Sequence, residues 1–159
     1  MSIAAVQRHL AVSNLADVEL RSYLVQLCES LASSMISDPN LLSIEVTADD
    51  SVVDANKSVS LGLIVTELVI NALKHAYPGH ARGKIIVDYH AEGPNWRLTV
   101  KDDGIGMPTG TRKAEAGLGT GIVEALAKHL EAIVQVIDSD PGTAIMISHD
   151  KGVRRRPAV

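Results

Sequence analysis

The pattern of apolar and polar residues predicts an α/β sandwich, a mixed, mainly antiparallel sheet of about five strands covered on one face by about three helices. Two observations support this fold class. Short runs alternate apolar and polar residues with a period of two, and longer runs between them carry apolar stripes at helical spacing. The chain has 159 residues, of which 46% are hydrophobic, with no Phe and a single Trp. One domain with a core of Leu, Ile, Val and Ala is therefore expected.

The N-terminal part is predicted to contain two helices and a strand. Residues 1–12 form a short apolar helix without a cap, which suggests an element continued from upstream or packed on a partner. After a break, Asp17 caps a second helix. The apolar stripe of this helix consists of Leu20, Leu24, Leu27, Cys28 and Leu31. Residues 42–47 alternate as a strand with one buried face, and residues 51–53 pair back after an Asp-Asp turn.

A long helix from about Lys57 to Ala76 is predicted to be central, and Pro78 and Gly79 end it. Its polar residues Glu67, Asn71, Lys74 and His75 fall at i, i+4, i+7 and i+8 and therefore share one face. The opposite face consists of Leu61, Val65, Leu68, Ala72 and Ala76. A core helix thus presents a carboxylate, an amide, an amine and an imidazole along one edge.

Residues 84–90 and 96–101 alternate as two strands, joined by residues 91–95 as a hairpin with a longer loop. The alternation places Trp96, Leu98, Val100 and Asp102 on one side of the second strand. If that side faces the core, Asp102 points inward at the end of a strand, which costs several kcal/mol unless a group hydrogen-bonds the carboxylate. A ligand amine at the edge of the sheet is one such group.

The C-terminal part is predicted to contain a loop over residues 107–116, a helix over 120–130, and strands over 133–137 and 143–148. The sequence DSDPG between the two strands is a strong turn pattern. No internal repeat is present.

Charge and composition narrow the classes of function. The formal net charge of -4 argues against nucleic-acid binding, and only the tail 151–159 is basic. The single cysteine, Cys28, excludes an internal disulfide and is predicted to be a core residue. No apolar run approaches the roughly 20 residues of a membrane span. A soluble, cytoplasmic piece without membrane contact is therefore expected.

Three motifs carry polar or glycine residues suited to a nucleotide. In GLGTG, residues 117–121, glycines before a helix let backbone N–H groups approach a phosphate, although a simple tight loop has the same pattern. In DDGIG, residues 102–106, glycines allow the backbone to lie against a planar ring, or form an ordinary turn. Asn71 in mid-helix is unfavourable by roughly half a kcal/mol relative to Ala, and an oxygen offered to Mg²⁺ would explain it. An ordinary polar stripe, with His75 complementing the helix dipole, is the alternative.

Taken together, ELVINALKHAY, DDGIG and GLGTG resemble the N, G1 and G2 boxes of the GHKL ATPases, whose nucleotide site is the Bergerat fold. Within that superfamily the chain is most similar to the catalytic domain of bacterial sensor histidine kinases, over roughly residues 41–149. The stretch LGLIVTELVINALKHAYP carries most of the resemblance. The absence of a Phe-containing F box and the helix LRSYLVQLCESL resemble the subfamily with a short ATP lid and a His-Arg-x-Lys-Asn-type phosphoacceptor helix. The GLGTG sequence departs from the GLGL of many histidine kinases.

The resemblance implies a role for each motif residue. It implies that Asn71 coordinates Mg²⁺, that the catalytic Glu67 lies beside the phosphates and the metal, and that Asp102 accepts the adenine amine of ATP. Further cofactor-binding residues are then Lys74, His75, Gly104, Gly106, Gly117, Leu118, Gly119, Thr120, Gly121 and Thr143. Gly104 and Gly106 would shape the base pocket, residues 117–121 would close the phosphate side, and Thr143 would support Asp102 through a water. Residues 107–116 would be the ATP lid, with Arg112 and Lys113 within reach of the phosphates.

The resemblance also implies a function and partners. The γ-phosphoryl group of ATP would be transferred to a histidine on a phosphoacceptor hairpin and then to an aspartate of a response-regulator receiver domain, and the parent protein would be a homodimer. Residues 1–34 would be a remnant of the dimerisation hairpin with a connecting helix, 35–150 the ATP-binding domain and 151–159 a basic, disordered tail. His9 lacks the residues that follow an acceptor histidine, so a catalytic fragment, inactive in autophosphorylation without its hairpin, is expected. The alternatives are a degenerate domain that acts in docking or phosphotransfer, and an anti-sigma serine kinase.

Overall fold

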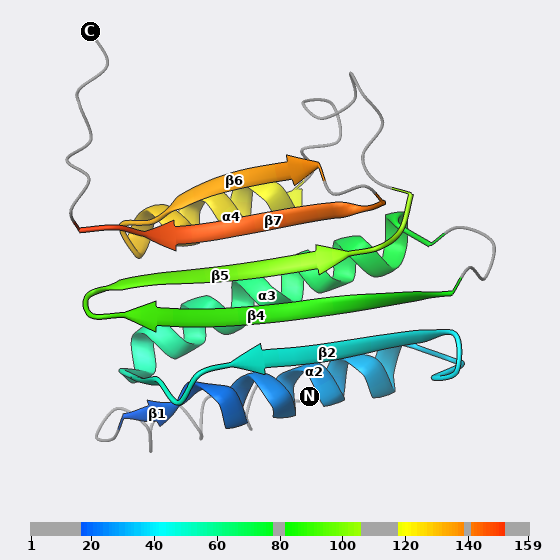
Figure 1. Cartoon of the computed structure of the whole chain (residues 1–159), viewed down its shortest axis with the longest axis horizontal. Coiled ribbons are helices and arrows are strands. Elements are labelled where there is room, and N and C mark those ends of the chain that lie inside the picture. Colours follow the sequence, from blue (N-terminus) through cyan, green and yellow to red (C-terminus); the bar gives the residue numbers. More distant parts are fainter. Residues whose placement is uncertain (1–16, 78–81, 106–117, 139–140, 152–159) are drawn as a thin grey trace, which may run out of the picture.

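A five-stranded sheet forms the centre of the computed structural model (Figure 1). The strand order is β2-β4-β5-β7-β6, in which β2 and β4 are parallel and all other neighbours are antiparallel. The strands are β2 (Leu42–Ala48), β4 (Gly83–Glu92), β5 (Asn95–Asp102), β6 (Ile133–Asp138) and β7 (Thr143–His149). The structure describes residues 17–77, 82–105, 118–138 and 141–151, with only the backbone at 118–120 and 138. The predicted mixed, mainly antiparallel sheet is confirmed.

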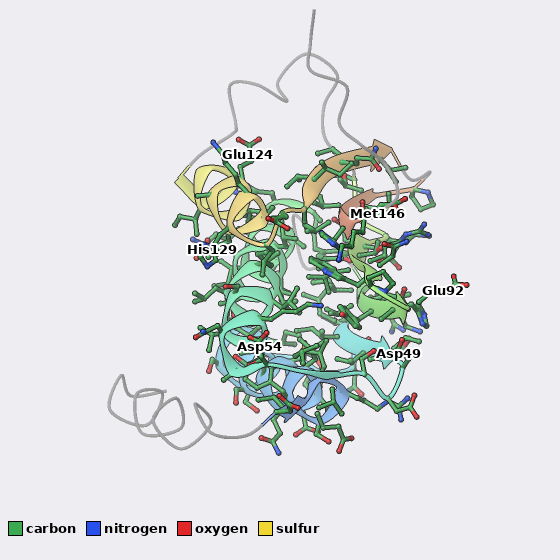
Figure 2. The ribbon with its side chains drawn as sticks, turned by 90° about the vertical axis from the view of Figure 1, so that its left-hand side faces the viewer. Asp49, Asp54, Glu92, Glu124, His129 and Met146 are labelled. Carbon is green, nitrogen blue, oxygen red and sulfur yellow. The ribbon has the colours of Figure 1, made fainter. Side chains whose placement is uncertain are left out.

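The described residues form three helices. They lie on one face of the sheet, as the side view in Figure 2 shows. They are α2 (Leu20–Met35), α3 (Ala55–His75) and α4 (Leu118–His129). The start of α3 and the end of α4 border one hollow, so these two helices run in opposite directions. The two-layer α/β sandwich predicted from the sequence is therefore confirmed.

The start of α2 differs from the prediction. Asp17 is not its cap: the helix begins at Leu20 with Glu19 in the N-cap position, without a side-chain cap. Residues Val18–Glu19 instead form a short strand, β1, which pairs antiparallel with β3 (Val52–Val53). The Leu20 N–H donates to the Ser51 carbonyl at 3.1 Å, so the chain segment before α3 satisfies the first donor of α2. The prediction that residues 51–53 pair back on the preceding strand is therefore wrong.

The helix α3 is the core helix of the domain. Asp54 caps it, since its carboxylate accepts the Lys57 N–H at 2.8 Å, and the helix ends at His75, so both predicted ends are within about two residues. Its ten buried residues are Ala55, Ser58, Ser60, Leu61, Gly62, Ile64, Val65, Leu68, Val69 and Ala72. By length and composition α3 is apolar enough to cross a membrane, contrary to the expectation that no such run exists. Its burial against the sheet and the flanking helices accounts for that composition.

The hairpin between β4 and β5 is tighter than predicted. The strands extend to Glu92 and Asn95, so only Gly93 and Pro94 form the turn, with Gly93 at φ +59°. On the core side, Tyr89 and Trp96 are buried among aliphatic residues, and Cys28 is also buried. Burial raises the pKa of the Cys28 thiol to about 11, which keeps it protonated and agrees with its predicted place in the core.

Several predicted features lie outside the described residues. They are the helix over residues 1–12 with His9, the helix stop at Pro78 and Gly79, the loop 107–116 with Arg112 and Lys113, Gly106, Gly117 and the tail 152–159.

Candidate functional site

The C-terminal ends of α3 and β5 and the start of β7 meet at one corner of the molecule, at the right in Figure 1. Backbone contacts join these three elements directly. The Ile105 N–H donates to the Ala76 carbonyl at 3.0 Å, and Asp102 pairs with Thr143 across the two strands. The end of the N box is thus in direct contact with the G1 box.

Asp102 is a buried carboxylate at the end of β5, with 9% of its surface exposed. The alternation that predicts its inward direction is borne out, because Trp96, Leu98 and Val100 are buried on the same side. Its Oδ1 atom accepts the N–H groups of Gly104 at 3.1 Å and Thr143 at 3.3 Å. The hydrogen bonds from the described residues to this carboxylate both go to Oδ1.

Burial raises the pKa of Asp102 above its ordinary value of 3.8, while the two backbone hydrogen bonds act in the opposite direction. A buried carboxylate that accepts two backbone N–H groups from the described part of the chain still carries a desolvation cost. A ligand that donates a hydrogen bond to this carboxylate would reduce the cost, and its identification as the adenine amine stays a prediction.

Two glycines around Asp102 are required by close backbone approaches. A Cβ atom on Gly104 would lie 2.2 Å from the Ala76 carbonyl oxygen, and one on Gly142, at φ +97°, would lie 1.9 Å from the Asp102 carbonyl oxygen. The close backbone contact at Gly104 is with the end of α3, and its place beside a planar ring stays a prediction. The backbone N–H of Thr143 donates directly to Asp102, and the additional support through a water stays a prediction.

The polar face of α3 runs toward this corner. Glu67 and Asn71 are half-buried one turn apart, and Lys74 and His75 are exposed in the last turn. Within the described residues, no group of three or more His, Cys, Asp or Glu side chains is arranged to hold a metal ion. The Mg²⁺ ion expected at Asn71 would take its other ligands from phosphates and water, and this metal site stays a prediction.

The G2 box differs from the prediction in its secondary structure. The backbone of Leu118, Gly119, Thr120 and Gly121 forms the first turn of α4 rather than a loop before the helix. Because α4 runs opposite to α3, this first turn lies toward the end of α3 that carries Asn71. Phosphate binds at the N-terminus of a helix as well as at a glycine loop. Phosphate binding by this segment therefore stays a prediction.

Two polar residues of the corner, Tyr77 and Asp103, are missing from the sequence prediction. The Tyr77 hydroxyl contacts the Asp103 carboxylate at 2.9 Å, although 26 positions separate the two residues. No periodic pattern links positions so far apart. The only local indication is the position of Asp103 beside Asp102.

A hollow of about 390 Å³ lies at the opposite end of α3. Its lining residues are Asp54, Ala55, Asn56, Lys57, His129 and Leu130, none of which is a predicted nucleotide ligand. The nucleotide prediction therefore rests on the corner around Asp102 and not on this hollow.

Comparison with known proteins identifies the family. Residues 56–152, well over half of the chain, match the family of histidine kinase-, DNA gyrase B- and HSP90-like ATPases. The chain belongs to this ATPase family. The match spans α3, β5 and α4, so it includes all three predicted boxes of this ATP-binding domain.

Individual relatives of this ATPase domain are sensor kinases. The chain is 30% identical over 132 residues to the blue-light-activated histidine kinase 2 of Erythrobacter litoralis. The matched region covers 82% of this chain and 38% of the relative. It is 28% identical to the sensor histidine kinase PdtaS of Mycobacterium tuberculosis, over 98% of this chain and 32% of the relative. The chain therefore spans about a third of the length of these curated relatives. A shorter match, to the serine-protein kinase RsbW of Listeria innocua, covers 36% of this chain.

The solved structures agree with this assignment. The histidine kinase domain of the blue-light-activated kinase EL346 from Erythrobacter litoralis superposes with a TM-score of 0.73 at 29% identity, over 82% of this chain and 60% of that one. The histidine kinase-, gyrase B- and HSP90-like fold predicted from the three boxes is thereby confirmed.

Proposed function

We propose that the chain is the ATP-binding catalytic domain of a two-component sensor histidine kinase. The observation that carries the proposal is the buried Asp102, which offers a carboxylate oxygen at the corner where the end of α3 meets the sheet. The sensor kinases among the matched relatives support it, because they match 82% and 98% of this chain. The histidine that accepts the phosphoryl group would lie on a separate phosphoacceptor hairpin, from which a receiver-domain aspartate would take it.

Each site residue then has a defined task. Asp102 would accept the adenine amine, Asn71 would offer its amide oxygen to Mg²⁺, and Glu67, one turn earlier, would lie beside the metal and the phosphates. Lys74, His75 and the first turn of α4 would neutralise phosphate charge. Bound Mg-ATP supplies the γ-phosphoryl group, and the protein contributes positioning and charge stabilisation.

The proposal extends to the rest of the chain. Residues 1–34 would belong to the dimerisation hairpin and its connection, and 35–150 would form the ATPase domain. The kinase would act in the cytoplasm as a homodimer, and the chain by itself would bind ATP without phosphorylating itself.

Calorimetric titration with ATP, with and without Mg²⁺, tests the nucleotide site. The wild-type chain is expected to bind saturably, and Asp102→Asn to weaken binding at least about tenfold, because the hydrogen bond to a charged acceptor is lost. Asn71→Ala should remove the effect of Mg²⁺ on the affinity. Asp49→Asn, which changes a carboxylate at the other end of β4, is the matched control. Unchanged ATP affinity in Asp102→Asn would exclude the adenine role, and no binding by the wild type would favour a degenerate docking module.

The bond that forms on the acceptor separates the two kinase candidates. With a phosphoacceptor hairpin added in trans, the product should be acid-labile and base-stable phosphohistidine. An acid-stable phosphoserine on a protein partner would instead favour the serine-kinase alternative suggested by the shorter RsbW match.

A further inference from the structure

We infer that Tyr77 and Asp103 are positioning residues for nucleotide recognition, because together they fix the turn that carries Asp102. The inference rests on the proposed role of Asp102 as the acceptor of the adenine amine. Neither residue is assigned to contact ATP, and both act through the backbone of residues 102–105.

Tyr77 follows α3 directly and is buried against the first residues of β4. Its ring fills the space over Gly83, where a Cβ atom would lie 1.9 Å from a ring carbon. The hydroxyl lies 2.9 Å from Asp103 Oδ1 and 3.0 Å from the Lys84 carbonyl oxygen, both of which are acceptors, and the Asp103 N–H donates back to it at 3.3 Å. The tyrosine hydroxyl thus joins the end of α3 to β4 and to the turn after β5.

Asp103 completes this set of contacts, which we call the Tyr77–Asp103 clamp. Its Oδ1 atom accepts the Lys84 N–H at 2.8 Å in addition to the Tyr77 hydroxyl. Burial raises the pKa of Tyr77 and the hydrogen bond to Asp103 raises it further, so the hydroxyl proton is retained. A charged acceptor with two donors forms stronger hydrogen bonds than a neutral one.

The clamp acts on Asp102 through the three residues that follow it. Asp103 is the next residue in the chain. Gly104 donates to Asp102 Oδ1, and Ile105 donates to the carbonyl of Ala76, the residue before Tyr77. Residues 76 and 77 therefore hold residues 103–105, and through them the direction of the Asp102 carboxylate.

A shift of the Asp102 carboxylate would reduce discrimination for the adenine amine more than binding of the phosphates, which other elements carry out. The probe is therefore a pair of ligands, ATP and purine riboside triphosphate, which has hydrogen in place of the 6-amino group. The dissociation constant of purine riboside triphosphate divided by that of ATP measures recognition of the amine. A general loss of folded protein does not change this ratio.

The test measures this ratio calorimetrically for the 159-residue chain and its variants. The wild type should prefer ATP, and Asp102→Asn should lose the preference. Tyr77→Phe keeps the ring over Gly83, and Asp103→Ala removes the carboxylate; each should lower the ratio by about 3- to 10-fold, the value of one hydrogen bond. Asp103→Asn should restore it in large part, because the amide oxygen can accept the same two hydrogen bonds.

The matched control is Asp49→Ala at the far end of β4, where Asp49 also accepts backbone N–H groups, from Ser51 at 3.0 Å and Ala91 at 2.7 Å. This variant should lower thermal stability without changing the ratio. An unchanged ratio in both Tyr77→Phe and Asp103→Ala, with the wild type selective, would overturn the clamp alone. A lower ratio in Asp49→Ala would also overturn it, because amine recognition would then follow overall stability. A wild type without preference for ATP would overturn the adenine role of Asp102 and the clamp with it.

Discussion

Two buried tyrosines, Tyr77 and Tyr89, lie near opposite ends of β4 and are stabilised in different ways. The Tyr77 hydroxyl contacts Asp103 and Lys84, whereas the Tyr89 hydroxyl has no hydrogen-bond partner among the described residues. Tyr89 instead contributes its ring, which stacks on Trp96 with the ring centres 6.1 Å apart. At one end of the sheet the tyrosine thus contributes polar contacts, and at the other it contributes ring packing, beside the backbone N–H that Asp49 accepts from Ala91.

The packed end continues across three strands. Trp96 also stacks on His149 of β7, with 6.3 Å between ring centres, and Lys57 Nζ lies 4.8 Å from the centre of the Trp96 ring. Burial lowers the pKa of Lys57, although Asp54 acts to raise it. The two ends of the sheet therefore use two kinds of interaction for different purposes. Ring packing gives stability without a fixed direction, while hydrogen bonds orient a carboxylate that must meet a ligand.

The largest effect is expected from Trp96→Ala. Removal of a buried Trp leaves a cavity and costs about 3 to 5 kcal/mol in the free energy of unfolding. Because Trp96 lies at the end of β5 away from Asp102, the ATP affinity of the folded chain should stay within about twofold of wild type, less than one ordinary hydrogen bond. Urea unfolding gives the stability, and ATP titration at low temperature gives the affinity.

The milder Trp96→Phe, which retains a ring, is the control for Trp96→Ala and should cost less stability. A fall in the ATP affinity of folded protein with either substitution would mean that the two ends are coupled. The contrast between a packed end and a recognition end would then be lost.

A smaller effect, of opposite sign at the two ends, is expected from replacing each tyrosine by Phe. Tyr77→Phe leaves the Asp103 and Lys84 groups without the hydroxyl and should destabilise the chain by about 1 to 2 kcal/mol. Tyr89→Phe removes a buried hydroxyl that has no partner in the described part of the chain, and it should be neutral or stabilise by up to about 1 kcal/mol. The midpoint of thermal unfolding distinguishes them, because both substitutions delete the same atom. Destabilisation by Tyr89→Phe would show that its hydroxyl has a partner.

The fold could be predicted because its signals are local. The two-residue period of β5 indicates that Asp102 faces inward, and the polar face of α3 follows from the spacing of Glu67 and Asn71. The pairing of β1 with β3 could not be predicted, since strands of two residues show no period. The tight Gly93-Pro94 turn was missed because Ala91 and Glu92 do not look like strand residues.

The site could be predicted only in part. Motif spacing gives the residues of the three boxes, but their roles toward ATP and Mg²⁺ stay predictions. The contact of Tyr77 with Asp103 depends on how the end of α3 meets the turn after β5, and no local pattern contains that information. The same holds for Gly142, whose need for a positive φ angle follows from its approach to the Asp102 backbone.

The smallest expected effect is a difference in pH dependence between Asp102 and Asp49. Burial raises the pKa of Asp102, so its contribution to stability is greatest below the ordinary value of 3.8 and declines as the pH rises through its folded-state pKa. For Asp49, burial acts to raise the pKa, but hydrogen bonds from Ser51 and Ala91 prevail and lower it. Its contribution is therefore present above the ordinary value and is lost as the pH falls.

Urea unfolding of ligand-free protein at several pH values measures both slopes, with Asp102→Asn and Asp49→Asn as the reference variants. The stability of wild type minus Asp102→Asn should fall with rising pH, and that of wild type minus Asp49→Asn should rise. If the Asp102 difference also rises, the N–H donors of Gly104 and Thr143 outweigh burial, and the carboxylate is stabilised without a ligand. The desolvation cost that a ligand amine could relieve at Asp102 would then be smaller than its burial implies. The pKa values of Asp102 and Asp49 would shift in the same direction, so the two ends would differ only in geometry.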